Sequence, residues 1–338
     1  SVKPFRETVS LVVKTCAQDY ESIYANVCHI VRQLSSPHLF CEYVLAIDTR
    51  TKDFLRQFTQ EASWDKLLEE VDRLIKHGVV DRYIILPEDE IASVNERWFG
   101  ISSTCTHSYL RAPVTSQLYL FEQAQGKYVL QMDSDVLIGR DDLKHDYLED
   151  MVRELEEHPA VVSVGFNIYQ ERGVKFKPYF GYEDGGFAPE VRMGLFDKER
   201  MLSMRPFYNK VLDKGWEYTW FRTMHLKQKE LNMSSIRGGD RRTFYVHPQN
   251  YRKSASDVWL TILDRVEQGY IPECQYGGFD CLGSYYDWCI PKREEPYVFV
   301  CTVRNVAYDR FLRMFASLIS QRDERWGMVL IDDASDNG

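Results

Sequence analysis

The sequence has no long hydrophobic run and no excess of positive charge. No stretch reaches the roughly 18 consecutive apolar residues of a membrane-spanning helix, and Ser1-Val2-Lys3-Pro4 is not typical of a signal peptide. Basic residues number 42 against 51 acidic ones, for a net charge of −9. Because binding to phosphate backbones needs clustered cations, we expect no nucleic-acid partner. We expect a cytoplasmic protein and leave peripheral membrane contact open.

The cysteines lack the close pairing of zinc and redox motifs. None of the eight belongs to a C-x-x-C pair. The nearest approach to a cluster is Cys274, Cys281 and Cys289, whose spacing is wider than structural zinc sites favour. Scattered cysteines in a chain of 338 residues are typical of reduced thiols, which fits a cytosolic protein.

What the sequence does have is an alternation of strand-like and helix-like segments. Apolar β-branched runs predict strands at 9–15, 42–47, 81–86 and 128–132. Apolar residues at helical spacing predict helices at 20–34, 64–77 and 115–124. This alternation predicts an α/β fold with a mostly parallel central sheet flanked by helices.

The alternation of strands and helices is less regular after residue 142, and the order of the first elements returns near the end of the sequence. We expect helices at 146–157, 213–229 and 256–268 and strands at 161–169 and 243–246. Residues 277–296, with Gly-Gly and Pro-Lys-Arg-Glu-Glu-Pro, predict a linker after a domain at 1–276. Beyond it, the order of strand, helix, strand and carboxylate seen in the first 48 residues returns. We therefore interpret 297–338 as the truncated start of a second domain of a longer protein.

Polar residues end three of the predicted strands. Thr15, Asp48 and Asp133 lie at strand carboxyl ends, where parallel sheets bind ligands, so we expect them to line one crevice. Asp133-Ser134-Asp135 adds a second carboxylate to this edge. Two such oxygens can hold one divalent cation, and oxygen ligands suit Mg²⁺ or Mn²⁺.

These residues carry a resemblance to a known family. The segment from Gly126 to Asp135, GKYVLQMDSD, resembles the G-x-Y-(apolar)₄-D-x-D segment of GT-A glycosyltransferases of the family-2 type. Residues 9–15 and 45–48 resemble the opening strand and the nucleotide-base aspartate of that family, and 298–338 resemble the same opening again. The resemblance implies the GT-A (nucleotide-diphospho-sugar transferase) fold over about residues 8–270.

The resemblance implies a donor site at the predicted crevice. Thr15 and Asp48 would contact the base and ribose of a nucleotide-diphosphate sugar. Asp133, with Ser134 beside it, would approach the ribose and the metal, and Asp135 would be the direct metal ligand. A late histidine often completes the metal shell in such enzymes, and His247 is the candidate here. The basic candidates for the diphosphate are Arg111 and Arg241.

The resemblance also implies a general base near the acceptor. Glu217 matches the position of the family's base, although Tyr218 replaces the usual second carboxylate. Asp213, on the same face if the helix extends that far, is the second candidate. Trp216 and Tyr218 flank Glu217 and are candidates for stacking on an acceptor sugar. A base here would give inverting transfer to a hydroxyl of a glycan or glycolipid acceptor.

Three other functions stay open at this stage. A retaining GT-A enzyme would share the fold and the D-x-D motif without needing a base at Glu217. A nucleotidyltransferase would need a glycine-rich basic loop after the first strand, which residues 15–19 do not offer. A non-catalytic copy would bind glycans or hold a partner, such as the second glycosyltransferase domain expected in the full-length chain.

Overall fold

A mostly parallel sheet organises the first 237 residues of the protein. The computed structural model describes residues 2–50, 61–168, 179–183, 185–238, 242–248, 256–289, 297–321 and 326–336. Within these ranges the large sheet has seven strands, in the order β12-β8-β9-β6-β2-β4-β5. They are β2 (Val9–Cys16), β4 (Glu42–Asp48), β5 (Arg82–Ile85), β6 (Tyr128–Asp133), β8 (Val161–Gly165), β9 (Met193–Asp197) and β12 (Ser234–Arg237). Only β9, within the described chain, runs antiparallel to its neighbours in this sheet.

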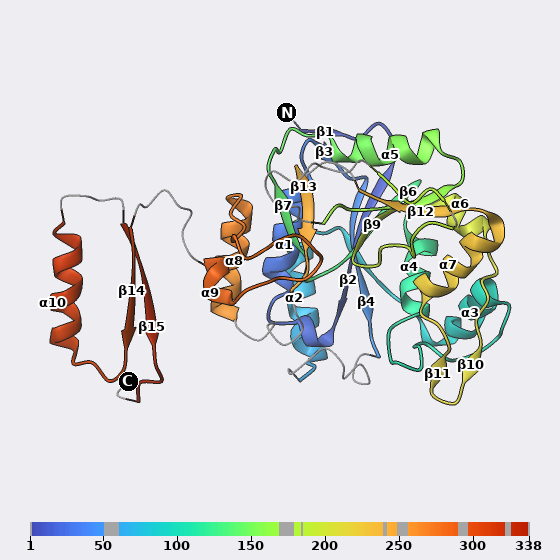
Figure 1. Ribbon diagram of the computed structural model, residues 1–338. Helices are drawn as coiled ribbons and strands as arrows, with labels where there is room; N and C mark the ends of the chain where they lie inside the picture. Colours follow the sequence, from blue (N-terminus) through green and yellow to red (C-terminus); the bar gives the residue numbers. More distant parts are fainter. Residues whose placement is uncertain are drawn as a thin grey trace.

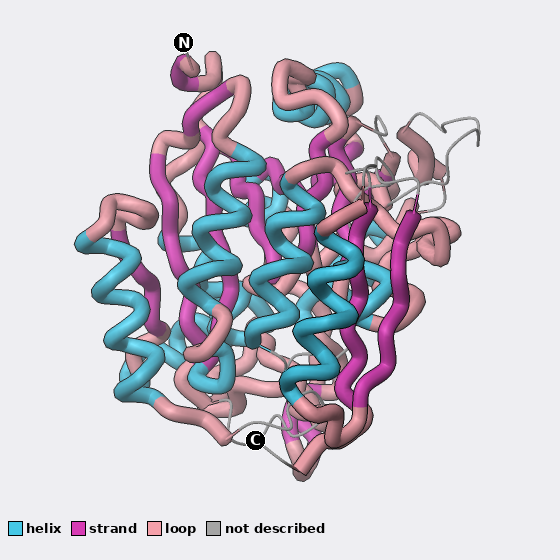
Figure 2. The backbone as a smooth tube through the Cα atoms, turned by 90° about the vertical axis from the view of Figure 1, so that its left-hand side faces the viewer, coloured by secondary structure: helices cyan, strands magenta, loops and turns pink. Residues whose placement is uncertain are grey.

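Helices cover both faces of this sheet, so the predicted α/β class is confirmed (Figure 1). The helices on the two faces are α1 (Ile23–Leu34), α2 (Trp64–Lys76), α5 (Tyr147–Glu157), α3 (Ile91–Phe99), α4 (Thr115–Gln123) and α7 (Trp220–Leu231). The first three share one apolar core with Leu11 and Val13 of β2, and the last three share another with Val12. Alternate residues of one strand therefore lie in opposite cores, because successive side chains of a strand point to opposite faces of the sheet. In Figure 2 most of the cyan helices stand upright beside the magenta strands of the sheet.

A smaller unit packs beside the sheet and carries the later part of the domain. Strand β7 (Leu137–Arg140) pairs antiparallel with β13 (Thr243–Val246). Helices α8 (Ser256–Glu267) and α9 (Tyr285–Cys289) pack on this pair, and Trp259, Leu263 and Trp288 are buried between them. The predicted linker at 277–296 is therefore wrong for 277–289, because Cys281 and Trp288 belong to this core. Residues 290–296 lie outside the described ranges.

The remaining elements of the domain are short. They are β1 (Lys3–Pro4), β3 (His38–Leu39), β10 (Val211–Leu212), β11 (Gly215–Trp216), α6 (Lys198–Ser203) and the 3₁₀ turns η1 (Ala17–Asp19) and η3 (Glu88–Glu90). Strands β10 and β11 form a tight hairpin just before α7. The predicted helix at 213–229 therefore begins later, at Trp220. None of the helices in the described residues is long and apolar enough to cross a bilayer.

Residues 297–336 form a separate β-α-β unit. Strands β14 (Tyr297–Val303) and β15 (Trp326–Asp332) pair in parallel, and α10 (Tyr308–Ile319) connects them, as predicted. The same connection joins β2, α1 and β4 at the start of the chain. No described residue of the unit is buried, and Val298, Val300 and Ile319 are among its exposed apolar side chains.

Candidate active site

The strand ends meet at one edge of the sheet, as the sequence predicts. Strand β2 lies between β6 and β4. Its residue Lys14 pairs with Asp133 of β6, and Cys16 pairs with Asp48 of β4. Thr15 lies between these two positions, so the three predicted polar residues share one edge.

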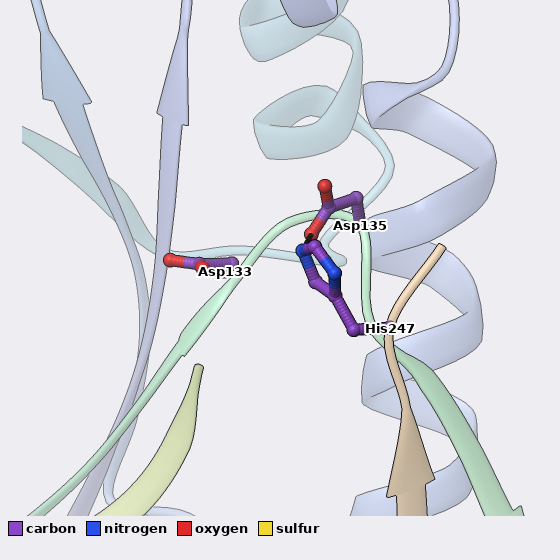
Figure 3. Close-up of side chains that lie close together, drawn as sticks. All are labelled: Asp133, Asp135 and His247. Atoms are coloured by element: carbon purple, nitrogen blue, oxygen red, sulfur yellow. Dashed lines mark ion pairs between the residues drawn. The ribbon is translucent and has the colours of Figure 1, made fainter. Parts of the chain in front are cut away.

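Asp133, Asp135 and His247 form a cluster at this edge. One ligand atom from each residue lies within 4.8 Å of the others. His247 Nε2 lies 3.5 Å from Asp135 Oδ1, and Figure 3 shows these two side chains meeting. Two carboxylates and one imidazole are a donor set that Mn²⁺ accepts readily and Mg²⁺ can use through its oxygens. The residues therefore fit the predicted divalent cation.

Chain pairing brings His247 to Asp135. Strand β7 begins two residues after Asp135, and its partner β13 ends immediately before His247. In their register Val246 lies opposite Leu137. Gly139 allows the two strands to close, because a Cβ atom there would lie 2.2 Å from the ring of Phe244. The position of His247 thus depends on an antiparallel strand pair that the sequence did not reveal.

Lys14 is a buried cation behind the first aspartate of the motif. Its side chain is 5% exposed, and its Nζ lies 3.0 Å from Asp133 Oδ1. It also donates to the carbonyl of Val191, at 2.5 Å. A buried ammonium needs such partners, because desolvation penalises its charge. Lys14 therefore fixes one carboxylate oxygen of Asp133 and offsets part of the negative charge of the cluster.

Asp19 organises the two predicted hydroxyl groups of the donor site. Its Oδ2 accepts from Thr15 Oγ1 at 2.8 Å and from Ser134 Oγ at 3.0 Å. The backbone N–H of Cys16 donates to the same oxygen at 3.2 Å. Asp19 thus links the end of β2 to the segment that carries Asp133 and Asp135. Sequence analysis missed it because it follows the strand in a 3₁₀ turn, outside any motif.

His107 lies at the Asp48 end of this sheet edge. Its Nε2 lies 2.9 Å from Asp48 Oδ2, and its Nδ1 lies 2.8 Å from Thr106 Oγ1. The backbone N–H of Arg50 donates to Asp48 Oδ1 at 3.3 Å. Both oxygens of Asp48 therefore have a fixed orientation. His107 comes from the loop after α3, so only the tertiary structure shows that it belongs to the site.

The candidate base lies on the hairpin that borders this loop. Glu217 follows β11, is partly buried, and its N–H donates to Lys210 at 2.8 Å. The preceding Trp216 N–H donates to the His107 carbonyl at 2.8 Å, so the hairpin is attached to the loop that carries His107. Asp213 lies exposed at the turn of the hairpin. The prediction that Asp213 and Glu217 share a helical face is wrong, since α7 starts only at Trp220.

The two aromatic candidates have different surroundings. Trp216 is fully buried, its ring lies 4.6 Å from that of Phe99, and its Nε1 donates to the carbonyl of Cys105. It stabilises the hairpin and has no face left for a sugar. Tyr218 is partly exposed and its ring lies 6.3 Å from that of Tyr208, which is exposed. This tyrosine pair is the aromatic surface beside Glu217.

The basic candidates are placed only in part. Arg111 is exposed in the same loop as His107, with a left-handed backbone at φ 67°. Arg241 lies outside the described residues. Arg237, which precedes it, pairs with the buried Glu190 at 2.9 Å and lies over the ring of Phe279. It therefore anchors the end of β12 to the segment around Phe279.

Comparisons with known proteins find similarity to solved structures. No family model and no curated protein matches the sequence. Staphylococcus aureus TarS is similar at 14% identity and a TM-score of 0.40, over 80% of this chain and 41% of that one. Mannosyl-3-phosphoglycerate synthase from Rubrobacter xylanophilus is similar at 14% sequence identity with a TM-score of 0.37, and the match covers 76% of this chain and 72% of that one. Glucosyl-3-phosphoglycerate synthase from Mycobacterium tuberculosis, solved with Mn²⁺ and UDP, is similar at 10% sequence identity with a TM-score of 0.38. That match covers 77% of this chain and 78% of the other. This chain thus spans less than half the length of TarS.

Proposed function

We propose that this chain is a metal-dependent, inverting glycosyltransferase of the GT-A type. It would move a sugar from a nucleotide diphosphate to a hydroxyl of a glycan or glycolipid. The observation that carries the proposal is the Asp133–Asp135–His247 cluster, which lies at the same sheet edge as Asp48. This edge is where a parallel α/β sheet binds ligands.

The donor would lie along the edge from Asp48 to Asp135. Asp48 would accept a hydrogen bond from an N–H of the base, with His107 holding its carboxylate in place. Thr15 and Asp133 would contact the ribose side. Asp135 and His247 would hold Mn²⁺ or Mg²⁺, which when bound would counter the charge of the departing diphosphate. Arg111 and Arg241 are the proposed cationic contacts to that diphosphate.

Glu217 would act as the general base. The acceptor hydroxyl would give its proton to the Glu217 carboxylate as its oxygen attacks the anomeric carbon, and the bond to the nucleotide diphosphate would break on the opposite side. This geometry inverts the anomeric configuration. The tyrosine pair at 208 and 218 is suited to the apolar face of an acceptor sugar. Asp213 is the weaker candidate for the base, because the hairpin turn leaves it in solvent.

A thermal-shift screen tests the donor site. Wild type and Asp135→Ala are heated with a panel of nucleoside diphosphates, with and without Mn²⁺. The proposal expects one nucleotide to raise the melting temperature only with metal, and expects the variant to lose this response. No response to any nucleotide would favour a non-catalytic copy.

Product analysis tests the base and the stereochemistry. With the nucleotide sugar so identified, Glu217→Gln should lower kcat by about 10²–10⁴-fold, whereas Asp213→Asn should not. The product anomer, read by NMR, should be inverted relative to the donor. A retained anomer with an active Glu217→Gln variant would favour the retaining alternative.

We also propose that residues 297–338 begin a second domain of the same type. Support comes from the repeated parallel β-α-β connection and from the apolar faces that this unit leaves exposed. Hydrogen–deuterium exchange on this chain should find the β14 and β15 amides poorly protected, because a lone β-α-β unit cannot bury a core. Protection equal to that of β2 would contradict this.

A further inference from the structure

The second ring nitrogen of His247 faces another carboxylate. His247 Nδ1 lies 3.3 Å from Asp280 Oδ1, on the side of the ring away from Asp135. Backbone pairing sets this contact, because His247 N–H donates to Phe279 at 2.6 Å and its carbonyl accepts from Cys281 at 2.8 Å. Residues 247 and 280 therefore lie side by side as partners of a parallel bridge.

The chemistry of a histidine ligand gives this contact a role. Imidazole binds a metal through the lone pair of one nitrogen, so the other nitrogen must then carry the proton. His247 Nε2 faces the carboxylates of the cluster, which leaves Nδ1 as the donor. A carboxylate that accepts this hydrogen bond fixes the tautomer and the ring orientation, and makes the ligating nitrogen more basic.

We propose that Asp280 is a positioning residue of the metal site. It accepts the Nδ1–H hydrogen bond of His247 and so presents Nε2 to the cation beside Asp135. The inference rests on the proposed metal-dependent function and extends the site to the segment 272–283. Asp280 itself touches neither the cation nor the reacting atoms.

The segment around Asp280 is built to hold this carboxylate in place. Gln275 is buried, its amide donates to the Asp280 carbonyl at 3.0 Å, and its side-chain oxygen accepts from Leu282 N–H at 2.7 Å. Arg192 Nη1 lies 3.7 Å from Asp280 Oδ1, and the Arg192 carbonyl accepts from the N–H of Asp133 at 3.0 Å. The loop is thus fixed from within, and Arg192 ties it to the first aspartate of the motif.

A plain surface ion pair is the competing interpretation. The Asp280 side chain is half exposed, and its contact with Arg192 is longer than a hydrogen bond. Exposed pairs of this kind contribute little. Under that interpretation, removal of the Asp280 carboxylate changes neither the cation affinity nor the tautomer of His247. The two interpretations therefore differ in measurable quantities.

Mn²⁺ titration of the 338-residue chain, followed by electron paramagnetic resonance, measures the first quantity. A carboxylate that hydrogen-bonds to a ligating histidine is worth about 10–100-fold in metal affinity, so Asp280→Ala should weaken Mn²⁺ binding by that factor. Asp280→Asn keeps a hydrogen-bond acceptor and should lose less. Asp264→Ala, on the exposed side of α8, is the matched control and should bind as wild type.

The second quantity is the tautomer of His247 in the metal-free protein. Long-range ¹H–¹⁵N correlation, at a pH where the ring is neutral, should show Nδ1–H in wild type and a shift toward Nε2–H in Asp280→Ala. A merely structural role would not move this signal. A wild-type ring with Nε2–H would overturn the proposal.

The outcomes separate this inference from the function on which it rests. If wild type does not bind Mn²⁺, both the metal-dependent function and the role of Asp280 are refuted. If wild type binds Mn²⁺ and Asp135→Ala does not, while Asp280→Ala binds as wild type, only the role of Asp280 is refuted. Circular dichroism of each metal-free variant checks that the fold is retained.

Discussion

The buried Lys14 allows a quantitative test of how the first aspartate of the site is held. Replacement by Met keeps the length and the apolar stem of the side chain but removes the ammonium. The two contacts at risk are those with Asp133 at 3.0 Å and with the Val191 carbonyl at 2.5 Å. We expect Lys14→Met to lower the free energy of unfolding, because Asp133 and the Val191 carbonyl both lose the ammonium that they contact.

The magnitude follows from the burial of Lys14, whose side chain is 5% exposed. A hydrogen bond to a charged group contributes about 1.5–3 kcal/mol, and an unsatisfied buried carbonyl costs about 1–3 kcal/mol. Two terms reduce the loss: Lys14 no longer has to be desolvated, and water reaches Asp133, whose side chain is 33% exposed. We therefore expect a net destabilisation of about 2 kcal/mol.

A double-mutant cycle with Asp133→Asn provides the measurement. Urea unfolding without metal gives the free energies for wild type, both single variants and the double variant. Residues in direct contact couple by about 0.5–3 kcal/mol, so the double variant should be more stable than the sum of the single losses predicts. Additivity to within about 0.5 kcal/mol would refute the proposed contact, since only independent sites add.

Three further changes probe the rest of the site. Gly139→Ala should lower the free energy of unfolding in urea by about 1–3 kcal/mol and weaken Mn²⁺ binding, because the added methyl group meets the ring of Phe244. Adding Phe244→Leu should restore both quantities, and a double variant that restores neither would contradict the clash. His107→Ala should weaken nucleotide binding by about fivefold in calorimetry, because Asp48 loses a hydrogen bond worth about 1 kcal/mol. An unchanged nucleotide affinity would exclude this role of His107. Burial lowers the pKa of His29, so as the pH falls the unfolded chain takes up this proton before the folded protein does. The free energy of unfolding in urea should therefore decrease below about pH 6.5. An equally steep decrease with falling pH in His29→Gln would refute this.

The sheet and its ligand edge could be predicted because their signals are local. The run from Val9 to Cys16 is rich in valine and leucine, which is typical of a strand buried on both faces, and every one of its residues is buried. Once parallel strands are expected, the edge that joins Asp48 to Asp133 follows from topology alone. His247 directly follows a clear strand, and the structure places its ring beside Asp135.

The supporting residues could not be predicted, because distant pairing decides their positions. Asp280 lies in a segment that reads as a linker, and only its bridge to His247 brings it to the site. Strand β9 was not predicted, because it runs antiparallel to its neighbours and so does not belong to the βαβ alternation from which the other strands were expected. Trp216 was expected to stack on a sugar because an aromatic beside a base suggests this, whereas the hairpin turns its ring into the core.

The pairing of β7 with β13 has a consequence for the order in which the protein is made. Asp133 and Asp135 leave the ribosome early, together with most of the sheet that supports them. His247 and its neighbour at residue 280 follow only after α7 and β12 have been synthesised. Because synthesis proceeds from the N-terminus, the nascent chain passes through a stage in which Asp133 and Asp135 are present and His247 is not yet made. The proposed cation would therefore find its full set of ligands only late in synthesis, and its binding would favour the complete domain over shorter nascent chains.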